Sequence, residues 1–490
     1  MTDTTLRRGA TFAALIVLII VVVIAAALAG CAVGPDYHQP ATPVAARFAA
    51  AADAPYSGGA ASAEFWTEFG DPELNTLVAD ALSANHDLRI ALAHLHEARA
   101  LRRQTQFDLA PTITADGGYT KERFAQVDSP TGVAYTTDYY SAGFDAFWEL
   151  DFFGRVRRSV QAQDAQVGAA EAGLHDAQVS VTAEVARNYF ELRGAQLQLS
   201  VAQRNVDNQR ETLKLTEAQL SAGRSTELDT ARAQAQLSTT LATIGPLEAT
   251  AARAIHRLAV LTGREPNALT PQLQRPADLP PLPELTAVGA PAELLRRRPD
   301  IRVAERQLAA STALVGVAIG DLFPQVTFTG SFNYSAAQLG ALGDSASRGF
   351  VIGPAISWPA FDLGRVQAQV QGSRARADVA LAQYEQTVLR ALEETEDALV
   401  THARTRDSLQ QARAAAEASR IAARIARKRY EEGIVDFLEV LDAERTQLAA
   451  EDRLAQSQTD AATSLIAVYK ALGGAWQSAP PPRYVRQAGG

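Results

Sequence analysis

The sequence contains very little cysteine, since Cys31 is the single one among 490 residues. One cysteine excludes an internal disulfide and any metal site built from several cysteines. Basic residues are in the minority, with 46 Lys and Arg against 55 Asp and Glu and a formal net charge of -9. A chain of this charge without a clustered basic face is a poor candidate for nucleic-acid binding.

Motifs for catalysis and metal binding are also missing. The chain contains no glycine-rich phosphate loop, Walker lysine or nucleophile elbow. Among the histidines only His94 and His96 are near each other, and at i, i+2 they face apart on a helix. The sequence therefore predicts neither an enzyme nor a metal site or other cofactor.

Proline is absent from Arg155 to Gly223. A continuous helix of this length would be roughly 100 Å long at ~1.5 Å per residue, far longer than a compact domain needs. Apolar residues recur along it every seven positions, which predicts a coiled-coil seam: Val185, Leu192, Leu199, Val206, Leu213 and Leu220. The chain turns at Gly223 and returns to Gly263, so the stretch predicts a long helical hairpin.

This hairpin occurs twice. At a shift of 210 residues, Gly154-Arg155-Val156 recurs as Gly364-Arg365-Val366, and the turn from Gly223 to Leu228 recurs as Gly433 to Leu438. Thr226 with Asp229, and Asp436 with Glu439, predict a capping box after each turn. The second hairpin therefore spans Arg365 to Gly473, and the chain is an internal duplication.

Four segments alternate between apolar and polar residues with period two: Thr112 to Thr120, Tyr139 to Leu150, Gln325 to Tyr334 and Phe350 to Trp358. Each has about the ~9 to 11 residues of a tilted transmembrane strand, and aromatic residues gather at their ends. A half-exposed soluble sheet would alternate in the same way. Asp116, Asp145 and Glu149 would face the water-filled side of a barrel.

Four strands leave two open edges, which cannot face hydrocarbon. Other copies must therefore close the barrel, with eight strands from two chains or twelve from three. From the residues alone, both remain open.

The N-terminus begins with Arg7-Arg8 and an apolar run from Phe12 to Leu28, followed by Ala29-Gly30-Cys31. A spanning helix of this length would be at the lower limit. The small residues before cysteine instead favour a bacterial lipoprotein signal peptide, with the covalent lipid on Cys31.

The predicted organisation follows from these features. Residues 1–30 form the lipoprotein signal peptide and 31–63 an extended, lipidated N-terminal segment. The first repeat, 64–263, holds a β-hairpin at 112–150 and a helical hairpin at 155–263. A proline-rich linker, 264–291, leads to the second repeat, 292–473, with a β-hairpin at 325–358 and a helical hairpin at 365–473. Residues 474–490 form a flexible tail.

Several motifs together resemble the outer-membrane factor family, the TolC-like exit ducts of Gram-negative export systems, in its NodT and OprM lipoprotein branch. They are Leu28-Ala29-Gly30-Cys31 with Val33-Gly34-Pro35-Asp36-Tyr37, Trp148-Glu149-Leu150-Asp151 with Phe153-Gly154-Arg155, Arg297-Arg298-Pro299-Asp300-Ile301, and Tyr469-Lys470-Ala471-Leu472-Gly473-Gly474-Ala475-Trp476. The resemblance implies a homotrimer with a twelve-stranded β-barrel in the outer membrane and a twelve-helix α-barrel in the periplasm. It also implies a periplasmic adaptor and an inner-membrane transporter of the resistance-nodulation-division type as partners.

The predicted function is a gated channel that carries small molecules through the outer membrane. Leu438 and Asp442, one turn apart, match the residues that narrow the periplasmic entrance in OprM-like members, so three copies of each would form the gate. The predicted adaptor contacts are the two hairpin tips: Gly223, Arg224, Ser225 and Thr226, with Gly433, Ile434 and Val435. The alternatives are a periplasmic adaptor or a structural coiled-coil lipoprotein, neither of which needs duplicated spanning strands. The exported substrate stays open.

Overall fold

The computed structural model describes residues 32–51, 62–128, 132–285, 287–474 and 476. The predicted signal peptide, Cys31 and most of the predicted tail lie outside these residues. The chain forms two compact units, one of residues 1–41, 95–170 and 303–385, the other of residues 42–94, 171–302 and 386–490. The boundary between the two units falls within the long helices. The two units are described separately.

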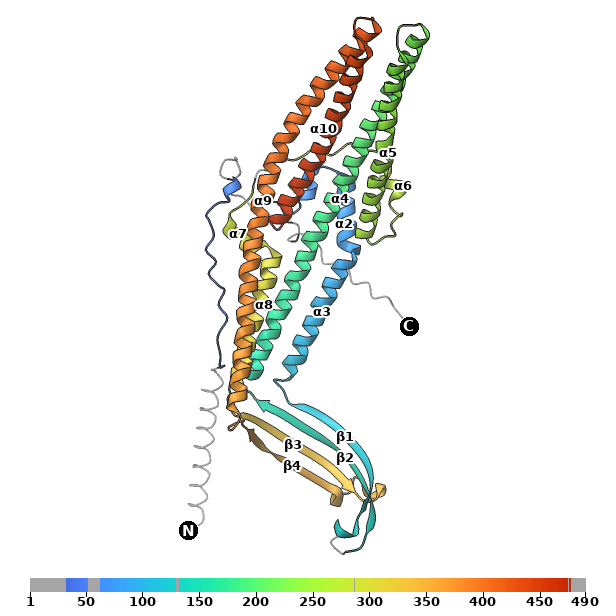
Figure 1. Ribbon diagram of the computed structural model, residues 1–490. Helices are drawn as coiled ribbons and strands as arrows, with labels where there is room; N and C mark the ends of the chain where they lie inside the picture. The colour runs from blue at the N-terminus through green and yellow to red at the C-terminus, as the bar shows by residue number, and fades with distance from the viewer. Residues whose placement is uncertain (1–31, 52–61, 129–131, 286, 475, 477–490) are drawn as a thin grey trace. The chain divides into compact units, whose positions relative to one another are not determined.

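The first unit contains one antiparallel sheet of four strands in the order β1-β2-β3-β4 (Figure 1). The strands are β1 (Thr112–Phe124), β2 (Tyr135–Leu150), β3 (Gln325–Ala336) and β4 (Arg348–Ser357). All four lie on the segments predicted from alternation, although β1 runs further and β2 starts earlier than expected. Pro354 lies within β4 opposite Phe328, where proline removes one backbone donor from the strand.

The two repeats meet in the middle of this sheet. Each repeat forms its own hairpin, β1 with β2 and β3 with β4, and β2 pairs with β3 from Tyr140 opposite Ala336 to Leu150 opposite Val326. The duplicated halves therefore share one continuous sheet, and β1 and β4 form its two edges.

The described helices follow the same duplication. The first repeat has α2 (Pro72–Ala84), α3 (His86–Phe107), α4 (Arg155–Ser221) and α5 (Glu227–Leu261), and the second has α7 (Pro291–Arg297), α8 (Pro299–Gly320), α9 (Leu363–Glu431) and α10 (Phe437–Ala471). The helices α4 and α9 hold 67 and 69 residues, which confirms the predicted long arms. The short helix α6 (Thr270–Leu273) lies in the proline-rich linker.

The main core of the second unit lies where α2, α4, α5, α9 and α10 meet. Phe65 stacks on Tyr469 with 4.9 Å between the ring centroids, and the Tyr469 hydroxyl donates to Glu68 at 2.6 Å. Arg298 donates to Asp300, to Glu394 and to the Ala471 carbonyl at the end of α10. The motif residues Arg298, Asp300 and Tyr469 are thus core and capping residues.

The predicted heptad seam of α4 is only partly correct. Val185, Leu192 and Val206 are buried, whereas Leu199, Leu213 and Leu220 are only half-buried. Polar side chains occupy the buried face of α4 towards its end: Asn205, Gln209, Thr212 and Thr216. The periodicity located the seam, but its composition changes along the helix.

Among the described residues, no helix is both long enough and apolar enough to cross a bilayer. The same part of the chain contains no group of three or more His, Cys, Asp or Glu side chains arranged to hold a metal ion.

Candidate functional site

The two hairpin tips have the same turn. Gly223 and Gly433 both have φ of 72°, in the left-handed region that ends helices. Their amides donate to Leu220 and Tyr430 at 2.9 and 3.0 Å. The next amides, Arg224 and Ile434, donate back to the preceding helix turn at 2.8 Å. A Cβ added at either glycine would meet no atom within 4 Å, so only the backbone conformation requires glycine.

The first tip has the predicted capping box. The Thr226 hydroxyl accepts from the Asp229 amide, and the Asp229 carboxylate accepts from the Thr226 amide at 3.1 Å. The hydroxyl of Thr226 also lowers the pKa of Asp229 by hydrogen bonding to its carboxylate. At the second tip only Asp436 caps, accepting from the Glu439 amide at 3.2 Å. The prediction that Glu439 completes a second box is wrong, because its carboxylate accepts from Arg429 instead.

The predicted adaptor-contacting residues are displayed at these tips. Gly223, Arg224, Thr226, Gly433 and Ile434 are exposed, and Ser225 and Val435 are half-buried. Val435 packs against a small apolar cluster just behind the second tip, made of Ala233, Tyr430, Phe437, Val440 and Leu441. The structure brings each set together at one tip, and their role in binding an adaptor stays a prediction.

The predicted gate residues lie on the outer face of α10 in the isolated chain. Leu438 is 52% exposed, and Asp442 is exposed one turn further along. Their neighbours Phe437 and Leu441 are buried. Leu438 is therefore not part of the hydrophobic core of its own chain, and the side chains of Leu438 and Asp442 are accessible to other copies.

Sequence reasoning missed two buried carboxylates on α10. Glu444 and Glu451 are 5% and 7% exposed, although carboxylates on a helix normally lie on a solvated face. Glu444 accepts from Thr212 of α4 at 2.8 Å and from Arg427 of α9 at 2.6 Å. We call Thr212, Glu444 and Arg427 the outer layer, because it lies nearer the hairpin tips.

The inner layer has the same construction. Glu451 accepts from Asn205 of α4 at 3.3 Å and from Arg420 of α9 at 3.2 Å. On each of the three helices its residue lies seven positions from the corresponding residue of the outer layer. A repeat of seven keeps the same faces in contact along a coiled coil, so both layers join α4 to the α9–α10 hairpin. The seven-residue spacing of the two glutamates is a signal that could have located them.

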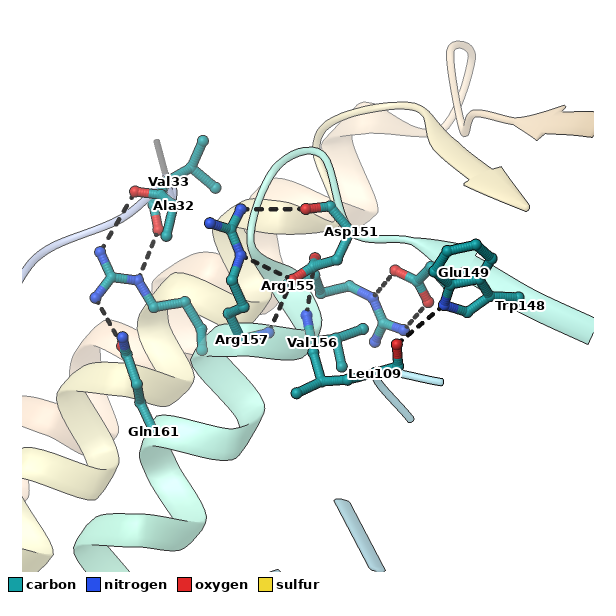
Figure 2. A network of polar contacts seen from close by, with 11 residues as sticks. Ala32, Val33, Leu109, Trp148, Glu149, Asp151, Arg155, Val156, Arg157 and Gln161 are labelled. Atoms are coloured by element: carbon teal, nitrogen blue, oxygen red, sulfur yellow. Dashed lines mark hydrogen bonds and ion pairs between the residues drawn. The ribbon is translucent and has the colours of Figure 1, made fainter. Parts of the chain in front are cut away.

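A further network of polar contacts lies at the junction between β2 and α4 (Figure 2). The Trp148 indole donates to the Leu109 carbonyl at 3.1 Å, and Arg155 binds Glu149 through two nitrogens. Asp151 accepts from the first amides of α4, at Val156 and Arg157, where a carboxylate also complements the helix dipole. The Glu149 carboxylate, predicted to face the water-filled side of the barrel, is paired with Arg155 at the start of α4, and its facing stays a prediction.

Burial and charge act on this junction. The hydrogen bond to Glu149 raises the pKa of Arg155, while burial opposes it. For Asp321, whose carboxylate faces the Arg155 guanidinium, burial raises the pKa. In the second repeat the Trp358 indole donates to the Leu322 carbonyl at 3.0 Å. This bond is the equivalent of the bond from Trp148 to the Leu109 carbonyl in the first repeat. Each repeat therefore fastens the end of its second strand to the loop before its first strand.

The duplication is also visible in comparison with known proteins. The family model described as outer membrane efflux protein matches twice, over residues 77–264 and 290–474. Outer membrane protein OprJ of Pseudomonas aeruginosa is 32% identical over 451 residues, which cover 92% of this chain and 94% of OprJ. Nodulation protein T of Rhizobium leguminosarum bv. trifolii is 30% identical over 432 residues, covering 88% of this chain and 91% of that protein.

Solved structures agree with these matches. The outer-membrane channel OprN is similar with a TM-score of 0.86 and 46% identity, covering 91% of this chain and all of the OprN chain. These relatives are described as efflux or channel proteins rather than as enzymes. The matches confirm the predicted fold class, mainly helical with a membrane β-barrel, and the predicted role in efflux. The chain therefore belongs to the outer membrane efflux protein family, as its resemblance to the NodT and OprM branch predicts.

Proposed function

We propose that this protein is the outer-membrane channel of a tripartite efflux pump, a gated duct that carries small molecules from the periplasm to the outside. Three copies form the channel, with twelve strands closing the β-barrel and twelve long helices forming the α-barrel. Its partners are a periplasmic adaptor and an inner-membrane transporter. An adaptor or a structural coiled-coil lipoprotein would not require the duplicated sheet.

The observation that carries the proposal is the open sheet with an apolar face. The order β1-β2-β3-β4 leaves β1 and β4 with one neighbour each. Phe350, Ile352 and Ile356 of β4 are 73%, 66% and 72% exposed. In a bilayer such a face is favourable, whereas an unpaired backbone edge is costly. Strands of further copies satisfy both edges.

Planar-bilayer conductance of the detergent-extracted protein, together with its mass in solution, tests this function. We expect small, cation-preferring channels from a trimer, because Asp442 would place a ring of carboxylates at the entrance. A folded monomer that forms no channel would refute the closed barrel and favour the adaptor or scaffold.

The gate assignment is tested in the same assay. Replacing Leu438 and Asp442 together with alanine should increase the conductance, because the exposed pair on α10 would no longer narrow the entrance. Leu228→Ala is a matched control, since Leu228 is the exposed equivalent of Leu438 in the first repeat. Unchanged conductance in the double variant would contradict the assignment.

The lipid anchor on Cys31 is supported by the residues that follow it. Arg158 is buried, donates to the carbonyls of Val33 and Gly34 at 3.1 and 3.2 Å, and pairs with Asp36 at 2.8 Å. The Val33 amide donates to the Phe153 carbonyl, just beyond the end of β2. The segment after Cys31 is therefore fixed beside the membrane sheet, where an acyl chain could enter lipid.

Each buried methylene of such a chain contributes ~0.8 kcal/mol to membrane binding. Mass spectrometry of the purified protein should find an N-terminus at Cys31 carrying acyl chains. Cys31→Ser should remove that added mass. An unmodified cysteine in membrane-extracted protein would refute lipidation without affecting the channel proposal.

A further inference from the structure

The two repeats join inside the chain where β2 ends beside the start of β3. Phe153, just after β2, stacks on Phe323, just before β3, with 4.6 Å between the ring centroids. The guanidinium of Arg155, at the start of α4, lies 4.0 Å from the Asp321 carboxylate. We call these four residues the internal joint, which combines an aromatic stack with an ion pair.

The duplication relates the two β-hairpins without a slip in register. A shift of 213 residues carries Thr112 of β1 to Gln325 of β3, and a shift of 210 carries Phe147 of β2 to Ser357 of β4. Thr112 lies opposite Phe147, and Gln325 lies opposite Ser357. Because the hairpins match pair by pair, the same two shifts convert the pairing of β2 with β3 into the pairing that β4 would form with β1 of the next copy.

This mapping keeps the two faces of the sheet consistent. Leu150 lies opposite Val326 inside the chain, which gives Ala360 opposite Ile113 of the next copy. The strand pairings put Ile113 and Ile352 in one row of the sheet, and Ala360 continues the face of Ile352 by alternation. A slip of one residue would instead set this face of β4 beside the opposite face of β1.

The same mapping brings opposite charges together at the helix ends. Arg155 maps to Arg365, and Asp321 maps to Asp108 of the next copy. Asp108 is exposed, and its carboxylate has no ion-pair partner among the described residues. Arg365 pairs with Asp362 at 2.8 Å, and these two side chains are 77% and 53% exposed. Both edges of the sheet therefore present a charge that is accessible to another copy.

The second repeat also lacks the acid that holds Arg155 within its own repeat. Arg155 binds Glu149 through two nitrogens, and the shift of 210 residues places Pro359 at that position. An exposed ion pair contributes little to stability, so Arg365 loses little when it leaves Asp362. The replacement of Glu149 by Pro359 therefore leaves Arg365 available to a partner outside its repeat.

We propose that Arg365 of one copy binds Asp108 of the next copy and holds each junction between copies, in the register that sets Ala360 opposite Ile113. Arg365 exchanges Asp362 for this partner on assembly. A ring of identical copies repeats one head-to-tail interface, so three copies form three such pairs. The inference rests on the proposed function, because it requires strands of other copies to close the barrel.

The packing beside this ion pair is weaker than in the internal joint. Leu363 and Ala110 of the next copy take the places of Phe153 and Phe323, so the junction has no aromatic stack. The ion pair therefore supplies a larger share of the contact between copies than its equivalent does within the chain.

The test reverses the two charges. Arg365→Asp and Asp108→Arg each set like charges against each other at every junction. At the temperature where half of the wild-type trimer survives in SDS, we expect several-fold less trimer from either variant. The double variant Arg365→Asp/Asp108→Arg restores the pair with exchanged charges and should recover the wild-type fraction. Asp362→Ala is the matched control, because it removes the partner of Arg365 within its own chain and should leave the trimer unchanged.

A pair of cysteines tests the register without changing a charge. Ile356 and Gly117 of the next copy correspond to Ala146 and Gly330, where a Cβ built on Gly330 lies 3.9 Å from the Ala146 Cβ, a distance that suits a disulfide. Oxidation of Ile356→Cys/Gly117→Cys should therefore give covalent dimers and trimers. Ile356→Cys/Gly118→Cys is the matched control, because Gly118 lies on the opposite face and should give none.

Rescue by the double charge reversal, with crosslinks confined to the Gly117 pair, supports the proposal. Single reversals with wild-type trimer would overturn the ion pair, and crosslinks confined to the Gly118 control would overturn the register. If the double reversal does not assemble, Arg365→Gln and Asp108→Asn decide. Losses of trimer that are no larger together than singly support the pair, and additive losses overturn it. A wild type that forms no trimer would instead refute the proposed function.

Discussion

Replacing Thr212 with valine isolates one hydrogen bond between the two hairpins. The Thr212 hydroxyl donates to Glu444 across the α4–α10 interface at 2.8 Å, and valine keeps the shape of the side chain while removing the donor. The other partner of Glu444, Arg427, belongs to the same hairpin as α10. A swing of that hairpin would therefore break the Thr212 bond and preserve the Arg427 pair.

The size of the effect follows from the burial of Glu444. A hydrogen bond to a charged group contributes about 1.5–3 kcal/mol. Because Arg427 still neutralises the carboxylate in the variant, we expect the lower part of this range, about 1.5–2 kcal/mol per chain. With about 1.4 kcal/mol for each factor of ten, the closed state should lose roughly 10- to 30-fold in population relative to the open state.

Single-channel recording measures this shift as a larger open fraction or conductance, and chemical denaturation measures the lost stability. Thr239→Val is the matched control, because the exposed Thr239 hydroxyl donates only to Ala235 within its own helix. A folded Thr212→Val trimer with wild-type conductance would refute the idea that the outer layer holds the hairpins together.

Three further predictions concern the tips, the membrane face and a buried histidine. Gly433→Trp should abolish export in cells while trimer assembly and insertion persist, since a left-handed tryptophan costs only about 1–2 kcal/mol at the tip and its side chain would extend from an exposed turn. Loss of assembly would make the residue structural. Ile352→Arg places a charge on the apolar face of β4 and should reduce the trimer yield in the outer membrane, because arginine on the lipid side costs about 2–4 kcal/mol at mid-bilayer. Val351→Arg, on the opposite face of β4, should be tolerated. Equal yields of the two variants would contradict the prediction that the Ile352 face contacts lipid. Burial, assisted by Arg406, lowers the pKa of His402 to about 4 from 6.5, so the unfolded chain takes up the proton first as the pH falls. Chemical denaturation should show the free energy of unfolding decreasing by up to about 3 kcal/mol as the pH falls from about 6.5 to 4. His402→Asn should reduce this pH dependence. An unchanged pH dependence in the variant would assign the effect to other titratable groups.

Local rules predicted the parts of this fold that local chemistry controls. The absence of proline from 155 to 223 permitted α4, glycine at 223 and 433 supplied the left-handed turns, and alternation located the four strands. Each of these features depends on a backbone preference or a side-chain period within one element. The second capping box failed because Arg429, seven residues before the capping residue Asp436, competed for the Glu439 carboxylate.

The sequence by itself determined the duplication, the spanning strands and the family, because these are repeated or periodic features of a single chain. The tertiary structure decided which polar groups are buried. Glu444 and Glu451 resemble solvated carboxylates until α4 supplies Thr212 and Asn205 and α9 supplies Arg427 and Arg420. The closeness of Gly194 on α4 to Thr459 on α10 likewise joins two residues that are 265 positions apart in the sequence. Burial of a charge depends on partners that only packing brings together, so the contacts that would hold the channel closed are a property of the folded chain.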